Sequence, residues 1–259
     1  MFTSQQMDFL PIWFVLLLTI LLLYLAYWAG VRLGKYAQVH WADQSTDLGL
    51  ITGASLSFLA LLLAFVINYS IGAFTERRQL VVSEANAIGT AYLRAGTLPD
   101  SARIESRQLF REYVDMRLVA VRAGNARTAI ARSEEIQDRL WNLAEALGRD
   151  NPTPTMSLYL SALNEVIDLH TERLSAERDF RLPLPILLGL LGVSFLTMVL
   201  MGITDSYHER RNRIALIVLV VILSLAFLLI IELDRSNTNL IQVSQQPLLD
   251  LQQKLLLSP

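Results

Sequence analysis

The residue types that most often carry chemistry are few in this sequence and stand far apart. The 259 residues include no cysteine, which excludes disulfides, thiolate nucleophiles, cysteine-ligated zinc and iron–sulfur clusters. The three histidines, His40, His170 and His208, show none of the spacings that metal ligands share. The sequence also contains no P-loop, no HExxH and no GxSxG. We therefore expect a protein that is not an enzyme and that holds no metal and no cofactor.

The most regular spacing falls inside a long apolar run, where steps of three or four residues gather small and polar residues on one helical face. That face comprises Gly49, Gly53, Ser57, Leu61, Phe65, Asn68 and Gly72. Small residues at this spacing let membrane helices approach closely, so the face could pack inside one subunit. It could instead line a pore in a ring of subunits, with Ser57, Leu61, Phe65 and Asn68 as the pore residues. A membrane-buried amide is costly without a partner or water, which favours the pore.

Two arginines follow the apolar run directly. Arg77 and Arg78 are typical of the interfacial charges that end a membrane span. If the preceding helix lines a pore, the same two residues would form a basic collar that draws anions towards its mouth.

The next stretch, SEANAIGTAYLRAG at residues 83–96, is unusually rich in small residues for a surface helix. A helical glycine costs about 1 kcal/mol relative to alanine, and close approach of another helix would offset that cost. We therefore expect Ala85, Gly89 and Tyr92 to form a seam between subunits. Glu84, Asn86 and Arg94 are expected to form a polar network at such a seam, or to contact a ligand.

The composition indicates a membrane protein. Hydrophobic residues make up 53% of the chain and charged residues only 18%. Four apolar runs, at residues 9–30, 48–73, 182–203 and 214–233, are long enough to cross a bilayer. The net charge of −2 gives no reason to expect nucleic acid as a partner.

The periodicity between the second and third runs is helical throughout. We therefore predict an all-α membrane protein with four transmembrane helices and a helical extramembrane domain between the second and third. The predicted parts are two spans in 1–75, the domain in 76–182, with Ser133 on its surface, two spans in 183–235 and an amphipathic tail in 236–259. The tail would pack on the membrane surface or on a neighbouring subunit, or be only partly ordered.

The short loops indicate the orientation of the chain. Arg32 and Lys35 follow the first span, and Arg210, Arg211 and Arg213 lie between the third and fourth. Because basic short loops stay in the cytoplasm, the domain is predicted to be periplasmic in a bacterium. Arginines on the domain side oppose this prediction, but long loops carry a weak orientation signal.

The segment RRQLVVSEANAIGTAYLRAGTLPDSAR at residues 77–103 resembles the bestrophin-like family of bacterial membrane proteins, whose function is undefined. The similarity extends to REYVDMRL at 111–118, to LDR after the fourth span and to VSQQPLLDLQ at 243–252. More distantly, the chain is similar to bestrophins, which are pentameric anion channels with a cytosolic helical domain. That resemblance implies an apolar neck in the second span; Leu61 and Phe65 suit it, whereas Ser57 departs from it. No acidic cluster resembling the calcium clasp of animal bestrophins follows the fourth span.

Two functions remain open at this point. The first is an oligomeric, pentameric anion channel of the bacterial inner membrane, lined by the second span. The alternative is a membrane-anchored helical sensor or scaffold without a pore. The expected partners are the lipid bilayer, further copies of the chain and, for the channel, anions.

Overall fold

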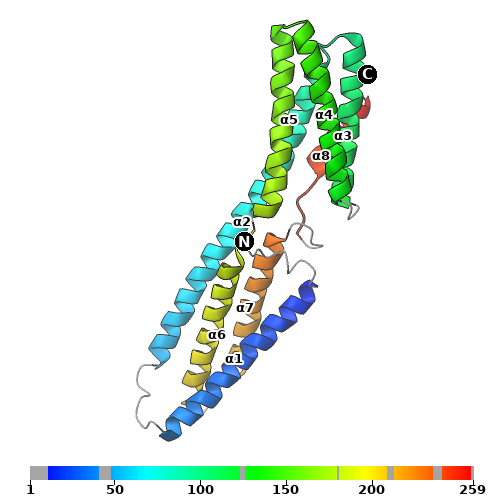
Figure 1. Ribbon diagram of the computed structural model, residues 1–259. Coiled ribbons are helices and arrows are strands. Elements are labelled where there is room, and N and C mark those ends of the chain that lie inside the picture. Colours follow the sequence, from blue (N-terminus) through cyan, green and yellow to red (C-terminus); the bar gives the residue numbers. More distant parts are fainter. Residues whose placement is uncertain are drawn as a thin grey trace. The chain divides into compact units, whose positions relative to one another are not determined.

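The computed structural model describes residues 11–40, 48–122, 126–179, 181–208, 213–235 and 241–257. Phe9, with which the first span was expected to begin, and Arg210 and Arg211 lie outside the described residues. The elements of the described part are all helices (Figure 1). They are α1 (Ile12–His40), α2 (Leu48–Ala95), α3 (Asp100–Arg122), α4 (Ala126–Asp150), α5 (Pro154–Asp179), α6 (Leu184–Ser206), α7 (Arg213–Asp234) and α8 (Gln246–Leu257).

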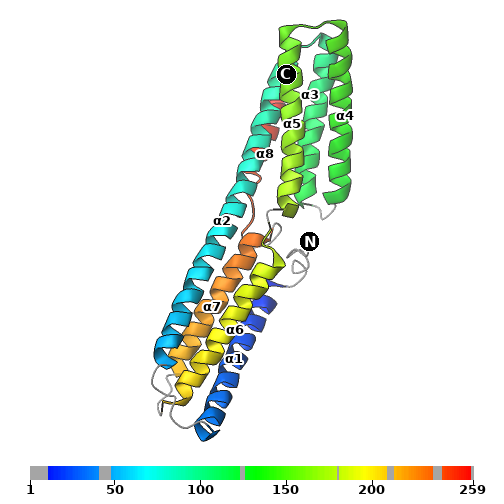
Figure 2. The same cartoon turned by 60° about the vertical axis from the view of Figure 1, so that its left-hand side comes forward.

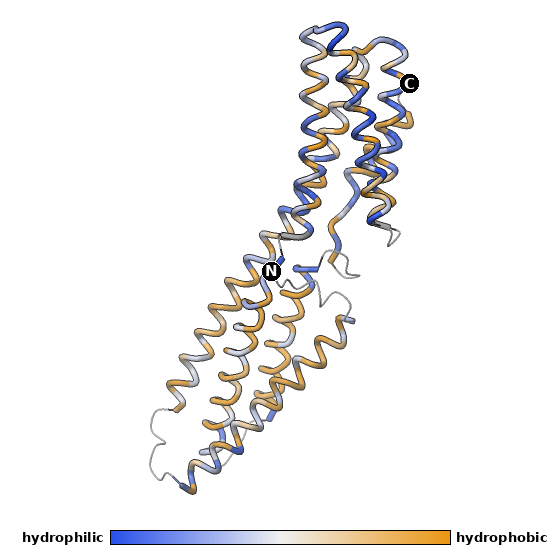
Figure 3. Tube along the Cα trace, in the orientation of Figure 1, coloured by the Kyte–Doolittle hydropathy of each residue, from blue (hydrophilic) through white to orange (hydrophobic). Residues whose placement is uncertain are grey.

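Four of these helices are long and apolar enough to cross a membrane: α1, α2, α6 and α7. Their apolar character is visible along the trace in Figure 3. The prediction of an all-α membrane protein with four such helices is confirmed. α2 continues as one helix of 48 residues far beyond its apolar part. No proline interrupts it before Pro99, and the chain turns at Gly96, whose amide donates to the carbonyl of Leu93 at 3.0 Å.

The chain divides into two compact units. The membrane unit comprises residues 1–74 and 180–242, and the helical unit comprises residues 75–179 and 243–259. α2 contributes its first part to the membrane unit and its second part to the helical unit. The tail beyond residue 242 therefore groups with the helical unit.

Glycines bring α1 and α6 into close contact inside the membrane unit, where both views show α1, α6 and α7 side by side (Figures 1 and 2). A Cβ added to Gly30 would lie 2.0 Å from the carbonyl oxygen of Val199. One added to Gly202 would lie 2.1 Å from that of Tyr27. Both contacts are to backbone, which cannot give way cheaply, so glycine is required at the two positions.

α2 is the least buried of the four membrane helices. Only 17% of its most apolar stretch is buried, against 33–39% for the other three. Leu59 and Leu63 are buried with α6 and α7 residues, and the hydroxyls of Thr52 and Thr204 lie 2.7 Å apart. Among the described residues, most of the membrane part of α2 is therefore left without a partner in its own chain.

The helical unit has its own hydrophobic core, in which α4 packs against both α3 and α5. Tyr92, Phe110, Tyr113 and Tyr159 are among its largest fully buried side chains. α4 continues through Gly148 to Asp150, so only residues 151–153 separate it from α5. Ser133 is buried rather than on the surface, and its hydroxyl donates to the carbonyl of Ala129 at 2.9 Å.

The tail packs on its own chain, through one apolar side of α8. Leu248, Leu251 and Leu255 are buried in the core of the helical unit, and α8 contacts α3. Arg111 donates from Nε to the carbonyl of Leu255 at 3.0 Å and from Nη2 to the hydroxyl of Tyr92 at 2.8 Å. One apolar stripe of α8 is thus covered internally, which explains its helical order.

Candidate functional site

The predicted pore residues all lie on the uncovered side of α2. Leu61 and Phe65 expose 52% and 64% of their surface, and Ser57 and Asn68 are also exposed. A Cβ added to Gly49, Gly53 or Gly72 would meet nothing within 4 Å. Among the described residues, these glycines therefore make no close contact inside one subunit, which was the alternative interpretation.

The two predicted mouth charges point in different directions. Arg77 is 5% exposed, whereas Arg78 is exposed, because consecutive helical residues are about 100° apart. Glu76 is exposed as well. The expected collar of two arginines is thereby reduced to Arg78, with an acidic neighbour on the same exposed side of α2.

The predicted seam residues are occupied largely by the chain's own packing. Ala85 and Tyr92 are buried in the core of the helical unit, and a Cβ added to Gly89 would lie 3.4 Å from Cδ1 of Leu251 on α8. The guanidinium of Arg107 lies 5.0 Å from the centre of the Tyr92 ring. The small residues of SEANAIGTAYLRAG therefore make room for α8 first, and only what they leave exposed is available to another subunit.

The three residues expected to form one polar network are not brought together. Asn86 is exposed. Arg94 donates from Nη1 to the carbonyl of Leu158 at 2.8 Å. Glu84 is fully buried and takes different partners. The physical reason is the helical period, because positions 84 and 86 are about 200° apart around α2.

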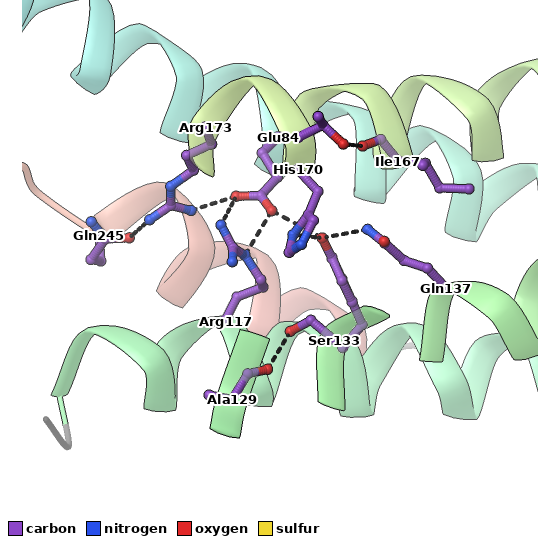
Figure 4. Close-up of polar contacts among 11 residues, drawn as sticks. Glu84, Arg117, Ala129, Ser133, Gln137, Ile167, His170, Arg173 and Gln245 are labelled. Carbon is purple, nitrogen blue, oxygen red and sulfur yellow. Dashed lines mark hydrogen bonds and ion pairs between the residues drawn. The ribbon is translucent and has the colours of Figure 1, made fainter. Parts of the chain in front are cut away.

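Glu84 is the centre of a buried ion-pair network (Figure 4). Nε of Arg117, on α3, lies 2.8 Å from Oε1 of Glu84. Nη1 of Arg173, on α5, pairs with Oε2 of Glu84. All three side chains are buried, at 0%, 4% and 6% exposure. Two cations therefore share one carboxylate inside the helical unit.

The hydroxyl of Tyr113 joins this ion pair to neutral groups. It donates to Oε1 of Glu84 at 3.1 Å and accepts from Nε2 of Gln137, on α4, at 3.1 Å. Nδ1 of His170, on α5, lies 3.1 Å from the same hydroxyl. Because the single hydroxyl proton goes to Glu84, Nδ1 of His170 must carry the proton and donate. Its Nε2 is then a buried lone pair, which no hydrogen-bond partner reaches within the described part of the chain.

The pKa values of these groups follow from burial and from the two guanidiniums. Burial raises the pKa of Glu84, but the charges of Arg117 and Arg173 outweigh it, so the pKa lies below its usual value. Burial, with the charge of Glu84, raises the pKa of Tyr113 well above its usual value. Burial, with the charge of Arg117, lowers the pKa of His170 to about 4. The network at neutral pH thus holds an ionised Glu84 and a neutral His170.

The network extends to the segment that leads into α8. Nη2 of Arg173 donates to Oε1 of Gln245 at 2.8 Å, as Figure 4 shows. The carbonyl of Gln245 accepts from the amides of Leu248 and Leu249, each at 3.1 Å, so Gln245 also begins α8. The C-terminal helix is therefore tied to Glu84 through one arginine.

The sequence contains a signal for this network in the spacing of its polar residues. Tyr113 and Arg117 are four residues apart, and His170 and Arg173 are three apart, so each pair shares a helical face. The buried neighbours of these residues on the two faces are mostly apolar, with Ser106 on α3 as a further buried polar residue. Polar residues recurring on the buried face of two helices require an internal partner, and Glu84 on the alanine-rich face of α2 is that partner.

A cleft of about 790 Å³ lies beside α2 in the helical unit. α2 contributes Asn86, Gly89 and Leu93 to its lining, and α8 contributes Asp250 and Lys254. The described residues contain no group of three or more His, Asp or Glu that could hold a metal ion.

The fold defines a class: a membrane protein with four spanning helices and a helical unit continuous with the second. Within that class, residues 37–248 match the model of the Bestrophin-like domain, and the chain belongs to that family.

Three solved structures that share the fold are bacterial bestrophin homologues from Klebsiella pneumoniae. The first, a variant, is 17% identical with a TM-score of 0.69 and covers 95% of this chain and 97% of its own. The second is 16% identical with a TM-score of 0.68 and the same coverages. The third, another variant, is also 16% identical with a TM-score of 0.68, over 94% and 97%. None of the curated proteins compared with the chain matches it.

Proposed function

We propose that this protein is the subunit of an oligomeric ion channel of the bacterial inner membrane, lined by α2. One observation carries the proposal: the membrane part of α2 exposes a face of small, apolar and amide residues that the described part of its own chain does not cover. A ring of copies would turn that face towards a common axis. Membership of the Bestrophin-like family and the likeness to bestrophin homologues support the same function.

In this channel Leu61 and Phe65 form the apolar neck and Asn68 a polar ring at its exit. Leu61 and Phe65 are four residues apart on one face, so a ring of subunits stacks two apolar constrictions. Ser57 follows one step further and widens the path. Five subunits are proposed from the resemblance to bestrophins.

The channel is proposed to prefer anions. Arg78 supplies the exposed positive charge beyond the neck, and Glu76 opposes it from the same exposed side. Arg78→Glu is therefore expected to move the reversal potential in a chloride gradient towards cation preference, and Glu76→Gln to move it the other way. Equal reversal potentials in both variants and the wild type would place ion selection elsewhere.

The test of conduction is single-channel recording of the purified protein in planar bilayers. Phe65→Ala should raise the unit conductance several-fold because it opens the narrowest apolar ring. Phe195→Ala, a matched aromatic truncation on the exposed side of α6, should leave conductance unchanged. An oligomer that is intact by size and carries no current in any variant would refute the channel.

The cleft beside α8 favours a second candidate, a membrane-anchored sensor or scaffold. A volume of about 790 Å³ is large enough for a small molecule. In that case the exposed face of α2 serves assembly alone. Phe65→Ala would then lower the stability of the oligomer without any current being measurable.

The helical unit is proposed to lie in the periplasm, as the basic short loops predict. Ser161 on α5 and His208 after α6 are both exposed and suit labelling in a chain without cysteine. A membrane-impermeant maleimide on intact cells should modify Ser161→Cys and not His208→Cys. The reverse pattern would place the unit in the cytosol, as the resemblance to bestrophins implies, and would leave the channel proposal standing.

A further inference from the structure

We propose that His170 is a proton-responsive latch: proton uptake at its buried Nε2 breaks the Arg173–Gln245 hydrogen bond and loosens the segment that begins α8. The latch lies within the helical unit and would operate whether or not the chain conducts ions. The buried network has no part in the proposed pore or in assembly of the oligomer, and the latch would give it a function of its own.

The first step is the charge that surrounds His170. The groups that face it come from every neighbouring element: Glu84 on α2, Tyr113 and Arg117 on α3, Gln137 on α4, Arg173 on α5 and Gln245 before α8. Glu177, which is exposed on α5, also acts on Arg117. Among the buried members, two guanidiniums and one carboxylate leave one excess positive charge.

The second step is the cost of adding a proton. The proton comes from water and must go to Nε2, because Nδ1 already donates to Tyr113. The new N–H would find no acceptor, since Nε2 has no hydrogen-bond partner, and His170 is 2% exposed. It would also place a third cation beside a single carboxylate, which is why the pKa of His170 lies at about 4.

The third step is how the network relieves that charge. Arg117 is bound to Glu84 through both Nε and Nη2, and both contacts are fully buried. Arg173 divides its guanidinium between Glu84 and Gln245, and its bond to Gln245 is only partly buried. Turning Arg173 outwards therefore moves one cation towards water at the lowest cost. The hydrogen bond to Gln245 is lost in that movement.

The fourth step is what Gln245 holds. Its side chain is fixed by Arg173 and its carbonyl starts α8. The far end of α8 keeps its own attachment through Arg111 and Leu255. Release of Gln245 therefore removes the polar anchor of the first turn of α8, which is then held through Leu248, while the last turn keeps its attachment through Arg111. On the proposed periplasmic side, acid outside the cell would reach this latch directly.

The test is amide hydrogen exchange of the full chain in nanodiscs, corrected for the intrinsic effect of pH. In the wild type the α8 amides should exchange faster than the α3–α5 core, and their protection should fall at least about tenfold between pH 6.5 and pH 4. His170→Gln can still donate to Tyr113 but cannot take up a proton, so the fall should be less than about twofold. His208→Gln, an exposed histidine outside the network, should behave as the wild type.

A second variant keeps the inference testable if His170→Gln does not fold. Gln245→Ala removes the tether without touching the buried ion pair, so α8 protection at neutral pH should drop to the acid level and lose its pH dependence. Three results would overturn the latch: α8 protection that is flat with pH in the wild type, α8 amides that exchange only together with the core, or an unchanged slope in either variant. None of them depends on a current, so the channel proposal is judged separately.

Discussion

The two parts of the continuous helix α2 differ in how far their side chains are buried. In the helical unit, Val81, Ala85, Ile88 and Ala91 are buried in the core of the chain's own bundle. In the membrane unit, residues at equivalent helical spacing, such as Leu61 and Phe65, stay exposed among the described residues. Small residues occur in both parts. The difference shows that small residues at regular spacing indicate a close approach but not whether the partner belongs to the same chain.

The same lesson applies between helices of the membrane unit. Gly30 and Gly202 leave no room for a Cβ, because another backbone of the same chain lies against each of them. Gly49 and Gly53 on α2 have open space. Contacts within the chain thus hold α1 against α6, whereas the membrane part of α2 is left for whatever surrounds the subunit. Variants of the two parts of α2 should therefore differ in what they damage.

The largest effect is expected in the helical unit, from Glu84→Ala. The change leaves the guanidiniums of Arg117 and Arg173 buried without a counter-charge. Breaking a buried pair in this way costs about 3–5 kcal/mol, so the free energy of unfolding of the helical unit should fall by that amount. The measurement is the exchange protection of the most protected amides of α3 and α5.

Asn86→Ala is the matched control, because it removes a polar side chain from the same helix two residues away. Asn86 is exposed, and the expected change is within about 0.5 kcal/mol. Equal destabilisation by both variants would mean that Glu84 is not the centre of the network.

The second effect is a dependence of stability on pH, and it arises in the same unit. The pKa of His170 is lowered to about 4 in the folded state, against an ordinary value of 6.5. The neutral histidine therefore contributes stability that is fully present above pH 6.5 and is lost as the pH falls towards 4. The loss should reach about 3 kcal/mol. Core amide protection of His170→Gln should show a smaller slope over this range, and an identical slope would assign the acid sensitivity to other groups.

Much of this fold follows from the sequence, because its strongest signals are local. Four long apolar runs predict four spans, and the proline at Pro99 marks the end of α2. Gly148 does not mark the end of α4, since a glycine in a helix can also make room for a neighbour. A Cβ at Gly148 would lie 3.6 Å from Leu160, in ordinary contact, so the helix passes through it.

The network could not be predicted from local signals, because its members come from four helices and the segment before α8. Grouping Glu84 with Asn86 and Arg94 relied on nearness in sequence, whereas the helical period sends Glu84 inwards and Asn86 outwards. The packing of the tail on its own chain could not be predicted for a related reason. An apolar stripe on a short helix shows that α8 must be covered, but not that α3 of the same chain covers it.

Gly89→Leu should have an effect of intermediate size. It should disturb the packing of α8 more directly than the assembly of subunits. A Cβ at Gly89 already lies in contact range of Leu251, so the remaining atoms of a leucine must displace α8 or be turned into the cleft. Overpacking of this kind costs about 1–3 kcal/mol. Amide protection of α8 should fall, and Gly53→Leu, in open space on the same helix, should leave it unchanged. Loss of the oligomer by Gly89→Leu with intact α8 protection would restore the simple seam between subunits.

The smallest effect on the subunit itself is expected from Phe65→Ala. A buried phenylalanine loses about 3–5 kcal/mol on truncation, because a cavity remains. Phe65 is 64% exposed in the single chain, so truncation should change the stability of the subunit by less than about 0.5 kcal/mol. Its effect should appear only in properties of the ring, namely conductance and oligomer stability. The effect on the single subunit and the effect on the ring are separated by two measurements of thermal unfolding. One uses subunits dispersed by detergent and the other uses the intact oligomer. If the dispersed subunit loses several kcal/mol, Phe65 packs inside its own chain and the membrane part of α2 is no more open than the part in the helical unit.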